Sequence, residues 1–340
     1  MAKKVSLKDI AEKVGVSVAL VSYVLNNQKE GRIGKAVAQK IRDTAKELNY
    51  RPNQIARSLK TSKTNTIGLL VSDIANPFFS ALARIIEDEA DKHHFTVIFG
   101  SSDENPQKSW TLMETLLNRQ VDGLIIAATT HTEEQIECLL QQHVPFVLVD
   151  RYFPALETNY VVLDNHRAAF MATSYLLDCG YTKIGLITHH SDLFHMQERV
   201  RGYKDAMEQH GCAILKYYIQ EADATELKKT VEQSVDKLLS SPSKVDAILF
   251  TNNLVAIYAV KYIHSKGIKI PDDLALVCFD EIDAMDFFYA PLTYLRQPMQ
   301  QIGREATRIL LDAIKGNTST TQIKLEAELV IRASVRNIIK

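Results

Sequence analysis

The chain has 340 residues, of which 46% are hydrophobic and 24% charged, an ordinary balance for a globular protein of two or three domains. No apolar run approaches the roughly 18 residues needed to span a bilayer, and the N-terminal residues lack the apolar core of an export signal. Four scattered cysteines without a CxxC pair argue against a zinc site or a disulfide framework. We therefore expect a cytoplasmic protein without a metal or cofactor.

The net charge of −1 hides an asymmetry along the chain. Residues 1–65 carry 14 lysines and arginines against five acidic residues, whereas the rest carries 26 against 36. This basic N-terminal region predicts contact with a polyanion such as DNA. A merely solvated basic surface would have the same charge, so charge alone leaves both interpretations open.

The N-terminal region has the pattern of a compact bundle of three helices. The expected helices are Leu7–Val14, Val18–Leu25 and about Lys35–Leu48. Ser6 and Ser17 can cap the first two helices, and Gly15 can end the first. The buried face of the third helix is expected to hold Val37, Ile41, Ala45 and Leu48.

The spacing of Ala11, Gly15 and Val21 is typical of a helix-turn-helix, although a chance bundle could share it. The second helix would enter the major groove, where Val18 and Ala19 can touch thymine methyl groups but cannot hydrogen-bond to base edges. Alternatively, Val18 closes the core of the bundle. Lys29 and Arg32 lie in the loop after this helix, and we expect them to contact phosphates rather than base edges.

A basic segment follows the bundle. Pro52 forbids continuation of the third helix, and Asn53 can cap the short run Gln54–Lys60, which is too short to be stable alone. Leu59 among cations is typical of a wedge inserted into the minor groove, unless it packs back onto its own domain. The DNA-contacting residues predicted for bundle and hinge are Ser6, Ser17, Val18, Ala19, Ser22, Tyr23, Lys29, Arg32, Asn53, Ala56, Arg57, Leu59 and Lys60.

From Ile67 onward, short apolar runs alternate with amphipathic helices. The expected strands are Ile67–Val71, Phe95–Phe99, Gly123–Ala127, Phe146–Val149, Tyr160–Leu163, Ile184–Thr188, Leu215–Ile219, Ala247–Phe250, Leu274–Cys278, Ile323–Leu325 and Leu329–Arg332. The expected helices are Pro77–Lys92, Gln107–Arg119, Glu133–Gln142, Arg167–Cys179, Glu198–His210, Glu226–Leu239, Leu254–Ser265 and Met299–Lys315. This alternation predicts an α/β class with two doubly wound parallel sheets, whose ligand sits off the carboxyl ends of the strands.

The predicted domains follow from these patterns. Residues 1–60 form the helix-turn-helix domain with its hinge helix, 61–66 form a linker, and 67–340 form an effector-binding and dimerisation domain. Within the last, lobe 1 is expected to comprise about 67–162 plus 293–322, and lobe 2 about 163–292 plus 323–340.

Many ordered motifs carry a resemblance that covers essentially the whole chain. They are Val5-Ser6-Leu7-Lys8-Asp9-Ile10-Ala11, Gly15-Val16-Ser17, Val21-Ser22, Tyr50-Arg51-Pro52-Asn53, Ala56-Arg57-Ser58-Leu59, Thr66-Ile67-Gly68, Asn76-Pro77-Phe78-Phe79, Gly180-Tyr181, Arg199, Gly202-Tyr203, Thr251-Asn252-Asn253, Ile270-Pro271-Asp272-Asp273-Leu274, Phe279-Asp280, Pro291-Leu292-Thr293 and Gln297-Pro298. The chain thereby resembles the lactose/galactose repressor family. The resemblance implies a homodimer, a palindromic operator, and an effector bound in a type I periplasmic-binding-protein-like cleft.

Several positions depart from the family pattern. Tyr23 stands where the family usually has Arg, Leu20 where it often has Thr, and Gly34 at the usual serine cap of the third helix. The operator half-site therefore cannot be transferred. Asn253 replaces a frequent Asp, while its neighbour Asn252 is retained.

By resemblance, the effector contacts should come from Asp73, Phe78, Asp150, His195, Arg199, Asn252, Asp280 and Gln297. These side chains suit a hydroxyl-rich ligand, because carboxylates, amides and a guanidinium pair with vicinal hydroxyls while an aromatic face covers C–H groups. Alternative roles remain for some of them. Asp73 could cap a helix, His195 could be a loop residue, Asp150 could pair with Arg151 or other surface cations, and Arg199 could bridge to Asp280 across the cleft.

These observations favour a DNA-binding transcription regulator, expected to be a repressor, over two other classes of protein. An exported solute-binding protein would share the lobes but would have no use for residues 1–60. An enzyme would need a nucleophile–base set, a metal cluster or a phosphate loop, and no such motif is present in the sequence. A sugar or sugar derivative is the expected effector, with a purine as the alternative, since Phe78 could also stack on a base.

Overall fold

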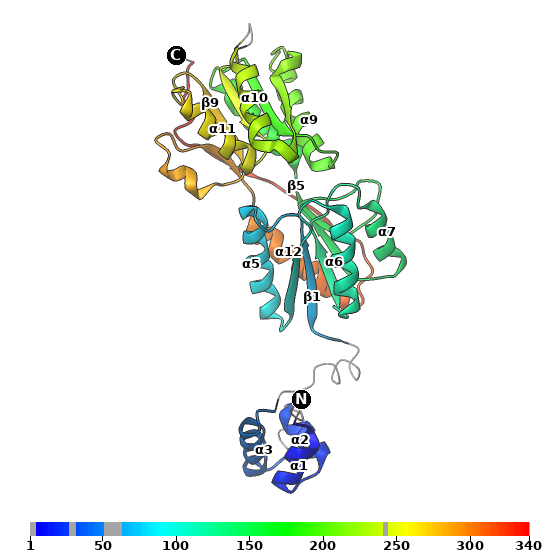
Figure 1. Cartoon of the computed structure of the whole chain (residues 1–340). Coiled ribbons are helices and arrows are strands. Elements are labelled where there is room, and N and C mark those ends of the chain that lie inside the picture. Colours follow the sequence, from blue (N-terminus) through cyan, green and yellow to red (C-terminus); the bar gives the residue numbers. More distant parts are fainter. Residues whose placement is uncertain (1–4, 27–31, 51–62, 241–243, 340) are drawn as a thin grey trace. The chain divides into compact units, whose positions relative to one another are not determined.

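A computed structural model describes residues 5–26, 32–50, 63–240 and 244–339 of the chain. The chain divides into two compact units, Met1–Thr64, here called the head, and Asn65–Lys340, here called the sensor (Figure 1). Six of the predicted DNA-contacting residues lie outside the described residues: Lys29, Asn53, Ala56, Arg57, Leu59 and Lys60.

The head consists of α1 (Leu7–Val14), α2 (Val18–Leu25) and α3 (Lys35–Glu47). Ser6 accepts the backbone N–H of Asp9 on its side chain, and the carboxylate of Asp9 accepts the N–H of Ser6 at 2.7 Å. Gly15 ends α1 at φ 80°, a left-handed conformation that glycine adopts without strain. Ser17 caps α2 by accepting an N–H at 3.2 Å. These caps confirm the predicted bounds of α1 and α2.

A small core holds the three helices together. Its buried residues are Ile10, Ala11, Val21, Val24, Ile41 and Ala45. The prediction that Val37 belongs to this core is wrong, because Val37 is 38% exposed and Ala38 packs against the core instead.

The first sheet of the sensor has the strand order β11-β5-β4-β3-β1-β2, and every pair in it is parallel. The strands are β1 (Thr66–Val71), β2 (Thr96–Ser101), β3 (Gly123–Ile126), β4 (Phe146–Val149), β5 (Tyr160–Leu163) and β11 (Gln322–Leu325). Its helices are α5 (Pro77–Lys92), α6 (Pro106–Asn118), α7 (Glu133–Gln141) and α12 (Met299–Ile314). Leu69 packs with α5 and α12 on one face, whereas Leu70 packs with α6 and α7 on the other, so both faces are covered.

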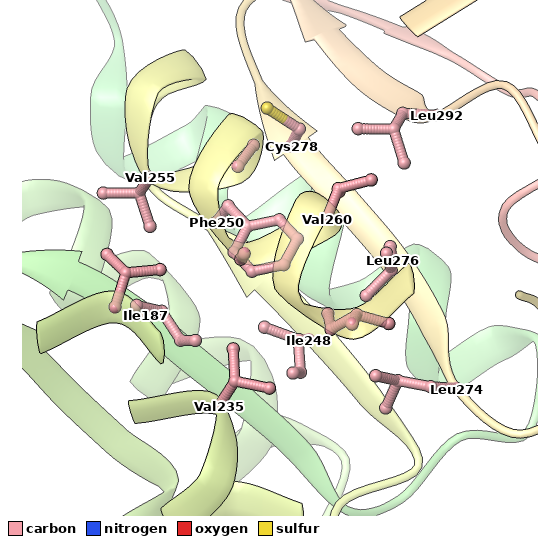
Figure 2. Packing of buried hydrophobic residues seen from close by; sticks show 14 of the residues in the cluster. Ile187, Val235, Ile248, Phe250, Val255, Val260, Leu274, Leu276, Cys278 and Leu292 are labelled. Carbon is pink, nitrogen blue, oxygen red and sulfur yellow. The ribbon is translucent and has the colours of Figure 1, made fainter. Parts of the chain in front are cut away.

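The second sheet has the order β12-β10-β9-β8-β6-β7, with only β12 antiparallel to its neighbour among the described pairs. The strands are β6 (Ile184–His189), β7 (Ile219–Ala222), β8 (Ala247–Phe250), β9 (Ala275–Phe279), β10 (Thr293–Arg296) and β12 (Glu328–Val330). Its helices are α8 (Asn165–Asp178), α9 (Phe194–Gln209), α10 (Leu227–Ser240) and α11 (Asn253–Ser265). Figure 2 shows Phe250 of β8 among Ile187, Val255 and Val260, within the core that α10 and α11 complete.

The chain passes between the two sheets three times: after β5, between β10 and α12, and between β11 and β12. We call the part built on the first sheet lobe 1 and the part built on the second sheet lobe 2. The prediction that residues 293–322 belong to lobe 1 and 323–340 to lobe 2 is wrong for two strands. Thr293–Arg296 pairs with β9 of lobe 2, and Gln322–Leu325 pairs with β5 of lobe 1. Periodicity cannot assign a four-residue strand to a sheet, since pairing is a tertiary property.

Two other elements also differ from expectation. The strand expected at Leu215–Ile219 begins only at Ile219, because Lys216–Tyr218 form a 3-10 turn that buries Tyr218. The helix expected from Glu198 begins at Phe194, so His195 lies in its first turn rather than in a loop. Among the described residues, no helix is long and apolar enough to cross a membrane.

Candidate functional site

The outward face of α2 presents the side chains predicted to read DNA. Val21 and Val24 are buried against the other helices, so Val18, Ala19, Ser22 and Tyr23 point away from the core or lie beside it. Val18 is 44% exposed, which contradicts the alternative that it closes the core of the bundle.

The remaining described members of this predicted DNA surface are Ser6, Ser17 and Arg32, all exposed. The two serines stand at helix N-termini, where unpaired backbone N–H groups and the positive end of the helix dipole favour a phosphate. The head therefore offers donors and apolar methyl groups on adjoining positions, a combination suited to phosphate positioning with base contact.

In the sensor, most of the predicted effector residues follow directly on the strands. Asp73 lies just beyond β1, Asp150 beyond β4, Asn252 beyond β8, Asp280 beyond β9 and Gln297 beyond β10. Because the carboxyl ends of parallel strands share one edge of each sheet, the fold gathers these side chains where open α/β sheets bind ligands.

Arg199 of α9 is buried in lobe 2. Its Nε donates to Oδ1 of Asn165 at 2.8 Å, its Nη1 donates to the carbonyl of Thr251, and its guanidinium lies 4.1 Å from the ring centroid of Phe279. Burial lowers the pKa of Arg199, although Asp280 and Asp150 act in the opposite direction. Since Arg199 and Asp280 both belong to lobe 2, the suggested bridge between them would not cross the cleft.

Asp280, Gln297 and Asn253 form a chain of polar groups beside the crossing between β10 and α12. Gln297 donates its Nε2 to Oδ1 of Asp280 at 2.6 Å, and Asn253 donates its Nδ2 to Oδ1 of Asn76 in lobe 1 at 2.8 Å. Oδ1 of Asn253 and Oε1 of Gln297 are buried without a hydrogen-bond partner in the described structure. Burial raises the pKa of Asp280, against the lowering influence of Arg199.

On the lobe 1 side, Arg151 is fixed by acidic groups. Its Nη1 and Nη2 donate to both carboxylate oxygens of Glu104 at 2.8 and 2.6 Å, and its Nε lies 3.3 Å from Oδ2 of Asp150. Asp150 thus adopts the alternative role as a partner of Arg151. Burial raises the pKa of Asp150. Burial also acts to raise the pKa of Glu104, but the hydrogen bonds and the charge of Arg151, together with His189 and Ser72, outweigh it and lower that pKa.

Two histidines occupy the lobe 2 side of this polar region. His195 is buried, its Nδ1 has no partner within the described residues, and burial holds its pKa well below the usual value. Burial, reinforced by Arg151, lowers the pKa of His189 to about 4. Both imidazoles are therefore neutral at pH 7. Nδ1 of His189 lies 2.9 Å from Nδ2 of Asn252, which fits a neutral ring accepting a hydrogen bond.

Two predicted effector residues serve the backbone instead. Asn252 caps α11, since its Oδ1 accepts the N–H of Val255 at 2.8 Å. Asp73 accepts the N–H of Ala75 at 2.9 Å and so holds a turn, while the cap of α5 is Asn76. Because both side chains already bond to the backbone, they suit a supporting role at the edge of the site.

A cavity of about 410 Å³ adjoins this polar region. Its lining residues are Pro77, Phe78, Ala81, Asn253, Ile257, Asp280, Glu281, Ile282, Asp283, Ala284, Arg296, Gln297 and Met299. Three of the eight predicted effector residues, Phe78, Asp280 and Gln297, are therefore brought together in one wall. The cavity has the volume of a small-molecule site with one aromatic plate and a few convergent polar groups.

Sequence reasoning gave no site role to Asn253, Glu104 or Asn165, and it named Arg151 only as a possible partner of Asp150. The departure of Asn253 from the usual Asp was visible, but its importance depends on Asn76, which is 177 residues away in the chain. Arg151 directly follows Asp150, and the pairing suggested for them is present, with Nε of Arg151 3.3 Å from Oδ2 of Asp150. No pattern in the sequence pointed to Glu104 or Asn165.

Comparisons with known proteins agree with this architecture. Residues 6–53 match the model of bacterial regulatory proteins of the lacI family, and residues 173–335 match the periplasmic binding protein-like domain. The chain is 32% identical over 337 residues to the HTH-type transcriptional repressor CytR of Escherichia coli strain K12, covering 97% of this chain and 96% of the relative.

Two solved structures share the fold. The transcriptional regulator CelR in complex with cellobiose is 25% identical, with a TM-score of 0.73 over 97% of this chain and 100% of that chain. The lac repressor dimer bound to operator and the anti-inducer ONPF is 22% identical, with a TM-score of 0.87 over 98% of this chain and 100% of that chain.

A helix-turn-helix head joined to a periplasmic-binding-protein-like sensor defines a DNA-binding regulator that responds to a small molecule. The extent of the match to CytR makes the assignment specific. The chain belongs to the lacI family of bacterial regulatory proteins, and it is a DNA-binding transcription repressor controlled by an effector rather than an enzyme.

Proposed function

We propose that this repressor acts as a homodimer on an approximately palindromic operator, and that its effector is a sugar or sugar derivative held between the two lobes. The observation that carries the effector proposal is that Asp280, Gln297 and Asn253 line one cavity together with its single aromatic side chain, Phe78. Carboxylate and amide oxygens suit vicinal hydroxyls, and one ring suits the C–H face of a sugar. A purine would favour a second ring, which the residues lining this cavity do not supply.

The DNA-contacting role proposed for α2 rests on its outward face. Val18, Ala19, Ser22 and Tyr23 would meet base edges, while Ser6, Ser17 and Arg32 would meet phosphates. Leu59, outside the described residues, would enter the minor groove at the operator centre. The substitution Leu59→Ser should weaken binding to specific DNA far more than binding to random DNA, and equal weakening of both would contradict the wedge.

Dimerisation is proposed through the sensor. Large apolar side chains are exposed on both lobes, with Phe99 of β2 at 59% and Phe287 at 94% exposure. A palindromic operator also requires a two-fold protein. Sedimentation of the full chain at micromolar concentration should show a dimer, and a monomer under these conditions would contradict the proposal. Action on chromosomal DNA would place the protein in the cytoplasm.

The effector proposal is tested by thermal unfolding of the full chain with a panel of sugars, nucleosides and free purines, because a ligand that binds only the native state raises the melting temperature. A sugar should raise it in a concentration-dependent manner. Asp280→Ala should abolish that shift, whereas Asp88→Ala, which changes an exposed carboxylate on α5, should preserve it. A shift with purines and none with sugars would overturn the sugar assignment.

A further inference from the structure

The orientation of the Asn253 amide is fixed by its partner in lobe 1. Oδ1 of Asn76 accepts the backbone N–H of Phe78 at 3.0 Å as the cap of α5, so this atom must be an oxygen. Asn253 therefore presents its Nδ2 to Asn76 at 2.8 Å, and its Oδ1 must point elsewhere. That oxygen is a hydrogen-bond acceptor, is buried, and has no partner in the described structure.

The same reasoning fixes the Gln297 amide. Asp280 receives a side-chain hydrogen bond at 2.6 Å, and a carboxylate can only accept, so Gln297 must present its Nε2. Its Oε1 is left as a second buried acceptor without a partner. Asn253 is 2% exposed and Gln297 is 6% exposed, yet both line the same cavity of about 410 Å³. An unpaired buried acceptor is costly, so this wall is built for a donor.

The charges around the cavity point in the same direction. Its lining residues include three carboxylates, Asp280, Glu281 and Asp283, but only one cation, Arg296. Arg296 is already bound by Glu281 at 2.9 Å and by Glu328 at 3.2 Å.

The two buried guanidinium groups, Arg151 and Arg199, are not among the residues that line the cavity. Arg151 is paired with both oxygens of Glu104, and Arg199 donates to Asn165 and Thr251. A negative group on the ligand would thus meet three carboxylates and, among the lining residues, only a cation that is already paired, which is unfavourable.

We propose that the effector is a donor-rich molecule without negative charge, whose O–H or N–H groups donate to Oδ1 of Asn253 and Oε1 of Gln297. This inference rests on the proposed function of the cavity as the effector site. It selects neutral sugars and amino sugars from the broader class of sugar derivatives. It excludes sugar phosphates and sugar acids as ligands of this site.

The test uses matched pairs of probes on the full-length protein. Glucose, ribose, cellobiose, cytidine and adenosine are each compared with a phosphate monoester, and glucose also with glucosamine and glucuronate, by the shift in melting temperature. Inorganic phosphate at equal concentration corrects for anion binding by the basic head. We expect at least one neutral or amino member to raise the melting temperature and its anionic counterpart to give at least a tenfold weaker apparent Kd.

The outcomes separate this inference from the proposed function. An anionic member that binds as well as its neutral counterpart overturns the inference but leaves a sugar-derived effector standing. Neutral nucleosides that bind when no sugar does overturn the sugar assignment and support the donor-rich inference. If no probe binds, both the proposed effector and this inference are overturned.

One variant and its matched control test the acceptor role of Gln297 independently of the probe pairs. Gln297→Met removes the acceptor at nearly constant side-chain volume. It should lower the affinity for the probe that binds by roughly tenfold, the usual effect of losing one buried hydrogen bond. Gln300→Met, at an exposed position in the first turn of α12, should leave the apparent Kd unchanged. Equal affinities of the two variants would contradict the role of Gln297. If Gln297→Met fails to fold, the matched pairs on the unmodified protein still decide.

Discussion

The head and the sensor expose their functional groups in opposite ways. The residues of α2 proposed to meet DNA lie on an outward face, above a core with only six buried apolar residues in the described part of the head. In the sensor, the polar groups proposed to meet the effector are buried at the sheet ends, between four large hydrophobic clusters. A small core makes the head sensitive to packing defects, while the buried site makes the sensor sensitive to charge.

The largest expected effect comes from removing residues 1–64. The shortened chain should lose at least about a thousandfold in affinity for a DNA site selected with the full-length protein, because the basic surface and base contacts are removed together. Fluorescence anisotropy at several salt concentrations measures this loss. Calorimetry should still show cooperative unfolding of the sensor, since its clusters are intact. Retained specific DNA binding by the shortened chain would contradict the division of roles.

The next effect contrasts the two cores. Ile41→Ala removes a fully buried side chain from the head and should cost about 2–5 kcal/mol, a large fraction of what so small a domain has. DNA binding at 37 °C should be lost, while the unfolding transition of the sensor stays in place. The matched variant Leu82→Ala, in the core of lobe 1, should lower the sensor transition and spare the head. If both variants shift the same transition, the two units do not unfold separately.

The contrast also explains what the sequence could predict. Local signals define the head: serine caps, Gly15 and helical periodicity give the bounds of α1 and α2 to the residue. The alternation of strands and helices likewise predicts the two parallel sheets. Strand β10 was missed because its sequence, Thr-Tyr-Leu-Arg, includes polar residues, whereas the predicted four-residue strands β4 and β8 are continuous apolar runs.

The effector site was predicted less completely, for a physical reason. Phe78, Asp280 and Gln297 line the cavity as expected, but whether a polar side chain is available there depends on partners distant in the chain. Asn252 and Asp73, predicted to contact the effector, are in addition held by hydrogen bonds to the backbone. The role of Asn253 was not predicted, because Asn76, which orients its amide, follows a strand of the other sheet.

A smaller effect concerns the pH dependence of stability. Burial lowers the pKa of His189 to about 4, and the pKa of His195 lies well below its usual value, compared with about 6.5 in the unfolded chain. Below pH 6.5 the unfolded chain takes up protons that the folded chain does not. Stability from each histidine is therefore present above pH 6.5 and declines by up to about 1.4 kcal/mol per pH unit toward pH 5.

Urea unfolding of the sensor between pH 7 and pH 5 measures this dependence. Asp150 and Asp280 act in the opposite direction, because burial raises the pKa of both carboxyls. The histidine contribution is therefore isolated by comparison. His189→Gln should flatten the decline in stability, and His94→Gln, at an exposed position, should not. A decline that is identical in all three proteins would show that His189 is not buried neutral.

The smallest expected effect concerns the hydrogen bond between Asn76 of lobe 1 and Asn253 of lobe 2 in the sensor. Asn253→Asp replaces the donor with an acceptor that faces Oδ1 of Asn76, so the bridge is lost and two acceptors oppose each other. We expect a loss of about 1 kcal/mol in stability, near the net value of one hydrogen bond. Asn76→Asp keeps both the cap of α5 and the acceptor for Asn253, and should cost less.

A double-mutant cycle separates this contact from the other effects of each substitution. When both residues are Asp, two carboxylates face each other, and the measured loss should exceed the sum of the two single losses. Urea unfolding of the four proteins at pH 7 gives the coupling energy between the two side chains. An additive result would mean that the amides do not interact in solution. A positive coupling would show that Asn253, at the position where the family often has Asp, ties lobe 2 to lobe 1 through its amide.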